Sequence, residues 1–143
     1  MASPARPPIT CHVLDTLSGT PAASIAVTLR LEGGSGPSSS SSGASFSGTT
    51  DADGRVTAWS AAGGSSLEAV FAGAAGDMCW VVGFDVGAYW AARGVAPFFP
   101  RVDVAFVTQG FEGRSADELH GKSAHWHVPL LLGPYSYTTY RGS

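Results

Sequence analysis

Hydrophobic and polar residues alternate along several short segments of this chain, and turn-forming residues separate the segments. In residues 123–132 (SAHWHVPLLL), one face of a strand would carry only apolar side chains: Trp126, Val128, Leu130 and Leu132. The other segments with a strand-like pattern are residues 9–16, 24–32, 67–71, 78–86, 101–108 and 135–140, and a further strand starting near Arg55. Short strands bounded by turns predict an all-β sandwich or barrel.

The remaining segments complete a single domain over residues 1–143. Residues 87–94 (GAYWAARG) predict one short helix that ends at Gly94. Residues 33–48 are rich in Gly and Ser and poor in apolar side chains, so we predict a flexible loop inserted between strands. Residues 1–8 form an N-terminal extension, and residues 110–122 a polar loop.

Two predicted strands carry histidines on the face opposite their core face. Thr10, His12 and Leu14 share this second face in one strand, and residues 125, 127, 129 and 131 (His, His, Pro, Leu) share it in the other. Histidine beside leucine is unusual on a solvent face. The predicted helix is too short to cover several strands, which leaves a metal site or burial against another copy of the protein.

Composition and charge narrow the classes of function. Hydrophobic residues make up 44% and charged residues 13% of the 143 positions, as in a folded domain. The net charge of −3 gives no basic surface, so we expect no nucleic-acid partner, and no apolar run is long enough to cross a bilayer. The N-terminus lacks a hydrophobic signal core, which predicts an intracellular protein in which Cys11 and Cys79 are buried thiols.

A metal site is the less favoured explanation of the histidines. His125 and His127 could bind zinc together with His12 or His120, but the sequence places no carboxylate or cysteine beside them as a further ligand. The segment DADG starts like a calcium loop, yet Ser60 stands where that loop requires a glutamate, so we interpret Asp53–Gly54 as a turn. The residues alone therefore leave a metal site open, as the less favoured explanation.

Four segments together resemble one known family. CHVLDTLSGTPA, TTDADGR, FFPRVDVAF and HWHVPLLLGPYSYTTYRGS are similar, in this order, to the transthyretin-like family and in particular to its enzyme branch, the 5-hydroxyisourate hydrolases. The final YRGS and the histidine in HVLD are the features that separate this branch from the hormone carriers. The resemblance implies a transthyretin-like (prealbumin-like) β-sandwich of two four-stranded sheets with one short helix. It also implies a homotetramer, whose central channel would cover the histidine-bearing face.

The resemblance further implies hydrolysis of 5-hydroxyisourate to 2-oxo-4-hydroxy-4-carboxy-5-ureidoimidazoline in urate degradation, without a cofactor. His12 and His127 would be the general base and proton shuttle, in an order left open, and Arg55 would bind substrate and steady the oxyanion. Tyr140 would contact substrate, and the carboxylate of Ser143 could orient a histidine or Arg55. The supporting substrate-binding residues would be His125, Arg141 and Gly142.

Two questions stay open at this stage. The alternative function is a non-catalytic transthyretin-like protein that binds a small molecule or serves as a scaffold, without turnover. The compartment is undecided between cytosol and peroxisome, because the chain ends in RGS and not in an SKL-type signal. Cys11, Asp15 and Tyr137 are expected to be structural, with Asp15 closing its strand into the turn that follows.

Overall fold

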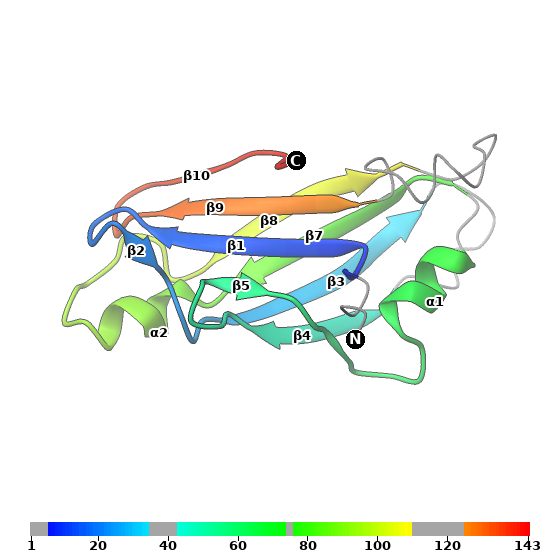
Figure 1. Ribbon diagram of the computed structural model, residues 1–143, viewed down its shortest axis with the longest axis horizontal. Coiled ribbons are helices and arrows are strands. Elements are labelled where there is room, and N and C mark those ends of the chain that lie inside the picture. The colour runs from blue at the N-terminus through cyan, green and yellow to red at the C-terminus, as the bar shows by residue number, and fades with distance from the viewer. Residues whose placement is uncertain (1–5, 35–42, 74–75, 110–124) are drawn as a thin grey trace, which may run out of the picture.

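The chain folds into two β-sheets packed face to face, with a short helix at either end of the sandwich (Figure 1). A computed structural model describes residues 6–34, 43–73, 76–109 and 125–143. In the first sheet the strand order is β10-β9-β1-β2, and β5 also pairs with β1. In the second sheet the order is β6-β4-β3-β7-β8.

The bounds of the elements follow the two sheets. The first sheet contains β1 (Ile9–Asp15), β2 (Thr20–Pro21), β5 (Arg55–Val56), β9 (Trp126–Leu132) and β10 (Tyr137–Thr139). The second contains β3 (Ala26–Gly34), β4 (Ser45–Thr49), β6 (Ser60–Ala61), β7 (Met78–Phe84) and β8 (Val102–Thr108). The helices are α1 (Leu67–Ala72) and α2 (Val86–Ala91).

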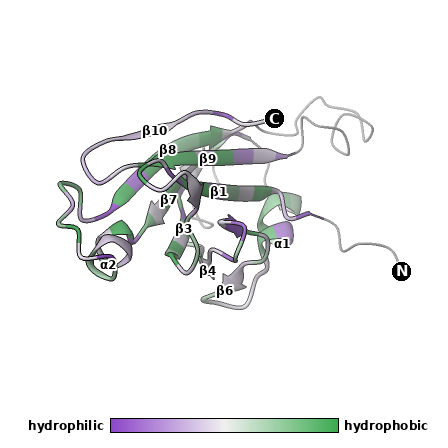
Figure 2. Cartoon of the chain, turned by 60° about the vertical axis from the view of Figure 1, so that its left-hand side comes forward, coloured by the Kyte–Doolittle hydropathy of each residue, from purple (hydrophilic) through white to green (hydrophobic). Residues whose placement is uncertain are grey.

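Period-two alternation supplies the core between the sheets. The predicted core face of β9 is buried along its whole length, and the matching face of β1 faces the same core: Trp126, Val128, Leu130, Leu132, Ile9, Cys11 and Val13 are each at most 5% exposed. Figure 2 shows β1 and β9 as mostly hydrophobic, with a hydrophilic stretch at the start of β9. The predicted all-β sandwich is therefore confirmed.

The predicted numbers of strands and helices need correction. Among the described residues each sheet has five strands instead of four, because the two-residue strands β2 and β6 each add a short pairing at one edge of a sheet. The strand predicted to start near Arg55 is β5. There are two helices among the described residues instead of one. The predicted helix is α2, followed by Gly94 in the left-handed conformation, with φ of 72°.

The prediction of a strand at residues 67–71 is wrong, because this segment is helix α1. Ser66 caps the helix: its side chain accepts a hydrogen bond from the backbone N–H of Ala69 at 3.1 Å. Leu67 and Phe71, four residues apart, are the buried residues of α1, and Glu68 lies in its first turn. The apolar residues of a five-residue segment fit either period, and here the cap and the i, i+4 spacing of the buried residues show a helix.

The predicted insert at residues 33–48 is partly strand. β3 continues through Gly34, and β4 begins at Ser45 and pairs with β3 so that Phe46 lies opposite Leu29. Phe46 is 2% exposed and gives this otherwise polar segment its anchor in the core. Residues 35–42, on which the prediction of a flexible loop falls, lie outside the described residues, as do residues 110–124 and the N-terminal residues 1–5.

Both cysteines are free thiols, on strands of different sheets. Cys11 is buried, as predicted, and burial raises the pKa of its thiol to about 12. Cys79 is only half-buried, so the prediction of a buried thiol fails there.

Asp15 ends β1 and fixes the turn that follows, as the sequence predicts. Its carboxylate accepts hydrogen bonds from the backbone N–H groups of Leu17 and Ser18, and from the hydroxyl of Tyr89 at 2.7 Å. Burial alone would raise the pKa of Asp15, but these hydrogen bonds outweigh it, and the pKa lies below its usual value.

Tyr89→Phe should destabilise the fold at neutral pH. The change removes a hydrogen bond to a buried carboxylate, a loss of about 1.5–3 kcal/mol in the free energy of unfolding. The pKa of Asp15 is lowered in the folded state, so this stabilisation is present above the unfolded carboxyl value of 3.8 and disappears as pH falls through the folded value. Urea unfolding at neutral and acidic pH measures the difference, with the exposed Tyr135→Phe as control.

Candidate active site

The parallel pairing of β1 with β9 brings the two histidine-bearing faces together. The register places Thr10 beside His127 and His12 beside Pro129. Side chains that are neighbours in register project to the same face of the sheet, so His12 and His127 belong to one surface. Their ring centroids are 6.5 Å apart. The pairing therefore joins two sequence motifs more than a hundred residues apart.

Arg55 reaches the same surface through β5, which pairs with β1 so that Arg55 lies opposite His12. The turn before it is the one that Asp53–Gly54 predicts, and Gly54 has φ of 76°. The Asp51 side chain holds this turn by accepting hydrogen bonds from the backbone N–H groups of Asp53 and Arg55. Arg55 is thus the first residue of β5, and Asp51 holds its backbone in place.

The C-terminal tail returns along β9. The backbone N–H of Gly142 donates to the carbonyl of His127 at 2.8 Å, and these two residues form an antiparallel bridge. Earlier in the tail, the Thr139 hydroxyl donates to the Pro129 carbonyl at 2.8 Å. The tail is therefore pinned beside the histidine and not frayed.

A cavity of about 560 Å³ opens where these elements meet. Its lining includes Thr10, Arg55, His127 and Ser143, together with Arg6. This cavity unites three of the four predicted catalytic residues. The fourth, His12, is absent from its lining but adjoins it through the pairing with Arg55.

The predicted substrate-binding residues are spread over two adjacent hollows. Tyr140 and Arg141 line a hollow of about 260 Å³ that also includes His127. His125, Arg141 and Gly142 line another, of about 490 Å³, together with Arg6 and Ser143. His127 and Ser143 are each shared with the main cavity. The predicted substrate-binding residues thus line two hollows that each share residues with the main cavity.

The hydroxyl of Thr10 contacts two histidines: His127 in β9, and His125 just before that strand. Thr10 Oγ1 lies 2.8 Å from His127 Nδ1 and 3.1 Å from His125 Nε2. The two rings are stacked, with centroids 6.4 Å apart and planes 14° from parallel. His125 Nδ1 lies 3.2 Å from the carbonyl oxygen of Pro7. Pro7 and Thr10 thus fix the orientation of both imidazoles.

The chain matches known proteins over nearly its whole length. The model of the HIUase/Transthyretin family matches residues 9–142. The chain belongs to this family. It is 38% identical over 143 residues to a Schizosaccharomyces pombe protein named "Probable 5-hydroxyisourate hydrolase", covering 98% of this chain and 94% of that protein.

Solved structures with this fold include both an enzyme and a transthyretin. A 5-hydroxyisourate hydrolase of Klebsiella pneumoniae superposes with a TM-score of 0.61 at 26% identity, covering 94% of this chain and 98% of that one. A transthyretin from Sparus aurata superposes with a TM-score of 0.67 at 28% identity, covering 96% and 97%. Because both kinds of protein share one sandwich, the function of this HIUase/Transthyretin family member must be argued from its site.

The three described histidines have pKa values below their usual 6.5, and burial is the largest cause for each. The positive charge of Arg55 is the next cause for His12 and His127, and that of Arg6 for His125. An imidazole with a lowered pKa is neutral at neutral pH. The site of this family member therefore offers unprotonated nitrogens next to a guanidinium.

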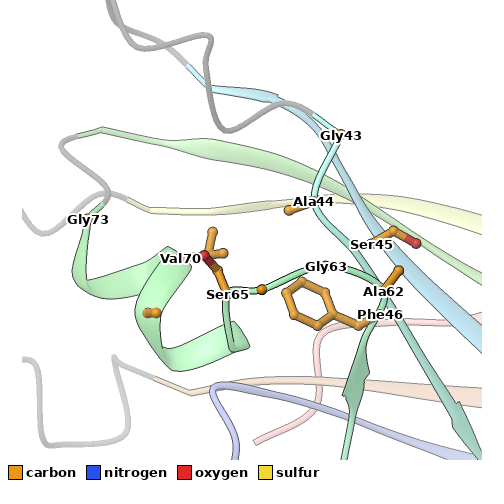
Figure 3. A pocket seen from close by; sticks show the side chains of 11 residues that line it. Gly43, Ala44, Ser45, Phe46, Ala62, Gly63, Ser65, Val70 and Gly73 are labelled. Atoms are coloured by element: carbon orange, nitrogen blue, oxygen red, sulfur yellow. The ribbon is translucent and has the colours of Figure 1, made fainter.

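A second large hollow lies away from these residues, between α1 and the strands β4 and β6 (Figure 3). Its volume is about 550 Å³, similar to that of the main cavity, but its lining contains only Gly, Ala, Ser, Phe and Val side chains. None of these can exchange a proton near neutral pH. The cavity at His127 is therefore the candidate active site because of the residues that line it, and not because of its volume.

The described part of the chain contains no group of three or more His, Cys, Asp and Glu residues placed to hold a metal ion. His120, the other histidine that the sequence offers as a ligand, lies outside the described residues.

Two residues of the site were not predicted for it. Thr10 was placed on the histidine face but given no role, although its position two residues before His12 is a signal that alternation provides. Arg6 was assigned to the N-terminal extension, and no pattern in the sequence distinguishes it from a solvent-exposed arginine.

Gly142→Ala should disrupt the site without affecting the core. A β-carbon at Gly142 would lie 2.6 Å from Cδ2 of His127 and 2.9 Å from Cγ of Pro129, so either the imidazole or the tail must move. A displacement of about 1 Å at a catalytic group can cost roughly 10² fold in rate. We expect turnover to fall on that scale while the thermal unfolding midpoint stays close to that of the wild type. Gly63→Ala, where a β-carbon meets nothing within 4 Å, is the control.

Proposed function

We propose that this protein hydrolyses 5-hydroxyisourate, opening its six-membered ring in urate degradation. The observation that carries the proposal is the cavity in which the His127 imidazole and the Arg55 side chain meet beside His12. A neutral imidazole can serve as the base, and a guanidinium as the oxyanion donor, in the hydrolysis of a cyclic amide. The relationship to 5-hydroxyisourate hydrolases over nearly the whole chain supports the choice of substrate.

The proposed chemistry uses only groups of the protein. One of the two histidines takes a proton from water as the water oxygen bonds to a ring carbonyl carbon, and the carbonyl electron pair moves onto its oxygen. Arg55 stabilises that developing negative charge. When the oxyanion collapses, the ring C–N bond breaks, and the histidine returns the proton to the leaving nitrogen. No metal or organic cofactor enters the proposal.

The tail and the neighbouring residues would position the planar substrate. Arg55 offers a rigid fork of donors to its carbonyl oxygens, and Tyr140 offers an exposed ring and hydroxyl to one side of it. His125, Arg141 and Gly142 line the adjoining hollow and would bound the substrate there. Ser143 would orient a histidine or Arg55 from the end of the tail.

The same proposal includes a homotetramer. The outer face of β1 and β9 carries Leu14 and Leu131, which are only half-buried in one chain, beside the histidines. Association of copies over this face would shield both leucines and enclose the cavity. The mass of the purified protein in solution tests this: a protein that is fully active as a monomer would contradict it. The proposal also includes an intracellular location, in cytosol or peroxisome. Neither helix of the described residues has the length and hydrophobicity needed to span a membrane.

The direct test is the ultraviolet decay of freshly generated 5-hydroxyisourate. We expect catalytic amounts of the protein to speed the decay well above the spontaneous rate, and exhaustive chelation to leave that rate unchanged. Binding of the compound without faster decay would instead support the alternative, a non-catalytic transthyretin-like binding or scaffold protein. Activity lost on chelation and restored by zinc would support a metal-dependent mechanism.

A further inference from the structure

Polar groups of four residues form a continuous chain of contacts beside the catalytic cavity. The carbonyl oxygen of Pro7 lies 3.2 Å from His125 Nδ1, and His125 Nε2 lies 3.1 Å from Thr10 Oγ1. Thr10 Oγ1 then lies 2.8 Å from His127 Nδ1. Each of these contacts has hydrogen-bond length. Thr10, whose hydroxyl lies at the centre, is buried, with 8% of the residue exposed.

The first contact fixes the direction of all the others. A carbonyl oxygen only accepts, so the proton of a neutral His125 must lie on Nδ1, which donates to Pro7. His125 Nε2 then carries a lone pair and accepts the Thr10 O–H. A hydroxyl has a single proton, so Thr10 Oγ1 can only accept from His127, whose proton must therefore lie on Nδ1. The lone pair of His127 is left on Nε2.

This order of protons requires a neutral His125, and its surroundings favour that state. The ring is half-buried and stacked on His127, and the charge that acts on it is that of Arg6. Burial and this cation both lower the pKa of His125, and the Pro7 carbonyl only partly opposes them. The other charged or titratable groups that act on His127 are Arg55 and His12, which likewise disfavour added positive charge.

We propose that His125 and Thr10 are positioning residues that hold His127 in the Nδ1–H tautomer, so that His127 Nε2 is the general base of the site. This inference rests on the proposed hydrolase function and deepens it by assigning the base. The assignment is compatible with the whole cycle: when Nε2 takes the proton from water, Nδ1–H continues to donate to Thr10, and no hydrogen bond has to be exchanged.

His12 is held differently. Among the described residues it makes no hydrogen bond to another side chain, but its ring hydrogen-bonds to the backbone of Asp53, and Arg55 lies opposite it on the paired strand. One backbone contact therefore orients His12, whereas a relay of two side chains orients His127. On this difference we assign the base to His127 and proton shuttling to His12.

The tautomer can be measured directly in the resting protein. Long-range proton–nitrogen NMR spectra of protein labelled with ¹⁵N-histidine distinguish Nδ1–H from Nε2–H rings, and His127→Gln and His125→Phe assign the signals. We expect Nδ1–H rings for both His125 and His127 near neutral pH. In Thr10→Val, which keeps the shape of the side chain but loses the hydroxyl, the His127 ring should no longer be held in that form.

Kinetics of the same variants test the consequence for catalysis. Thr10→Val should lower kcat by about 10- to 100-fold with KM within about twofold, the scale on which loss of an orienting partner acts. Thr10→Ser, which keeps the hydroxyl, should retain kcat within about threefold and the wild-type tautomer. The control is Thr28→Val, an exposed threonine of β3 in the other sheet.

The outcomes separate this inference from the proposed function. An Nε2–H ring at His127 in an active wild-type protein would overturn the relay and leave the hydrolase function standing. So would a Thr10→Val variant with unchanged kcat. Nδ1–H rings in a protein that does not hydrolyse 5-hydroxyisourate would support the proton order and overturn the role as base. If Thr10→Val does not fold, His125→Phe serves instead: it frees the Thr10 O–H to donate to His127 Nδ1, and an Nε2–H ring is then expected, while an unchanged ring contradicts the relay.

Discussion

His127→Ala should abolish most of the turnover of 5-hydroxyisourate while leaving the fold intact. Removal of a general base costs about 10²–10⁴ fold in rate, and we expect a loss of roughly 10²–10³ fold in kcat. His127 is half-buried on the outer face of its sheet and makes no part of the core, so the thermal unfolding midpoint should change little. Steady-state kinetics and a thermal melt of the same preparation measure both quantities.

The matched control is His120→Ala, in the predicted polar loop, which should leave kcat unchanged. The hydrogen bond that holds the tail joins the backbone N–H of Gly142 to the backbone carbonyl of His127, so the alanine variant should keep the tail in place. A variant with near-normal kcat would contradict the assignment of the base. A large loss of thermal stability would contradict the placement of this side chain outside the core.

Arg55→Leu should lower kcat/KM by about 10²–10³ fold, on the scale of losing a donor to a developing oxyanion. It should also move the acidic limb of the pH–rate profile. The Arg55 charge lowers the pKa values of His12 and His127, so its removal raises them. A base with a higher pKa is protonated at a higher pH, and the acidic limb should therefore shift toward neutral pH.

Arg55→Lys separates the two effects of this residue. Lysine keeps the positive charge but not the planar fork, so the acidic limb should stay near its wild-type position while kcat/KM remains low. Arg30→Leu, at an exposed residue of β3, is the control for loss of a cation elsewhere on the surface. If the limb does not move in Arg55→Leu, the charge of Arg55 does not act on the base.

Strand identity was predictable where alternation ran for five or more residues. In β1, β3, β8 and β9, one inward face per strand followed from the period of two, since successive side chains of a strand point to opposite sides. Of the two-residue strands, β5 was predicted from the Asp53–Gly54 turn before Arg55, whereas β2 and β6 were not, because two residues carry no period. The segment at α1 was misread for a related reason: its buried residues Leu67 and Phe71 fit the helical period, but the run is too short to exclude a strand.

The site was predictable in its parts, and the resemblance to the enzyme branch supplied their roles. Alternation alone placed His12 and His127 on faces opposite the core, and the structure confirms that they share one surface. It gave no reason to join Thr10 to both histidines of the other segment, or to bring Arg6 to the cavity. The roles of the site residues remain predictions, and the variants above test them.

The sequence by itself determined which side of each long strand enters the core and which residues are left to do chemistry, because both depend on spacing along one strand. Only the tertiary structure decided which of those residues meet. The parallel register of β1 and β9, the turn before Arg55 and the return of the tail to His127 are pairings between distant segments. Such pairings depend on hydrogen bonds between strands and on packing of two sheets, and no local pattern records them. The proposed order of protons through Thr10 depends on the pairing of β1 with β9 and on the contact of His125 with Pro7.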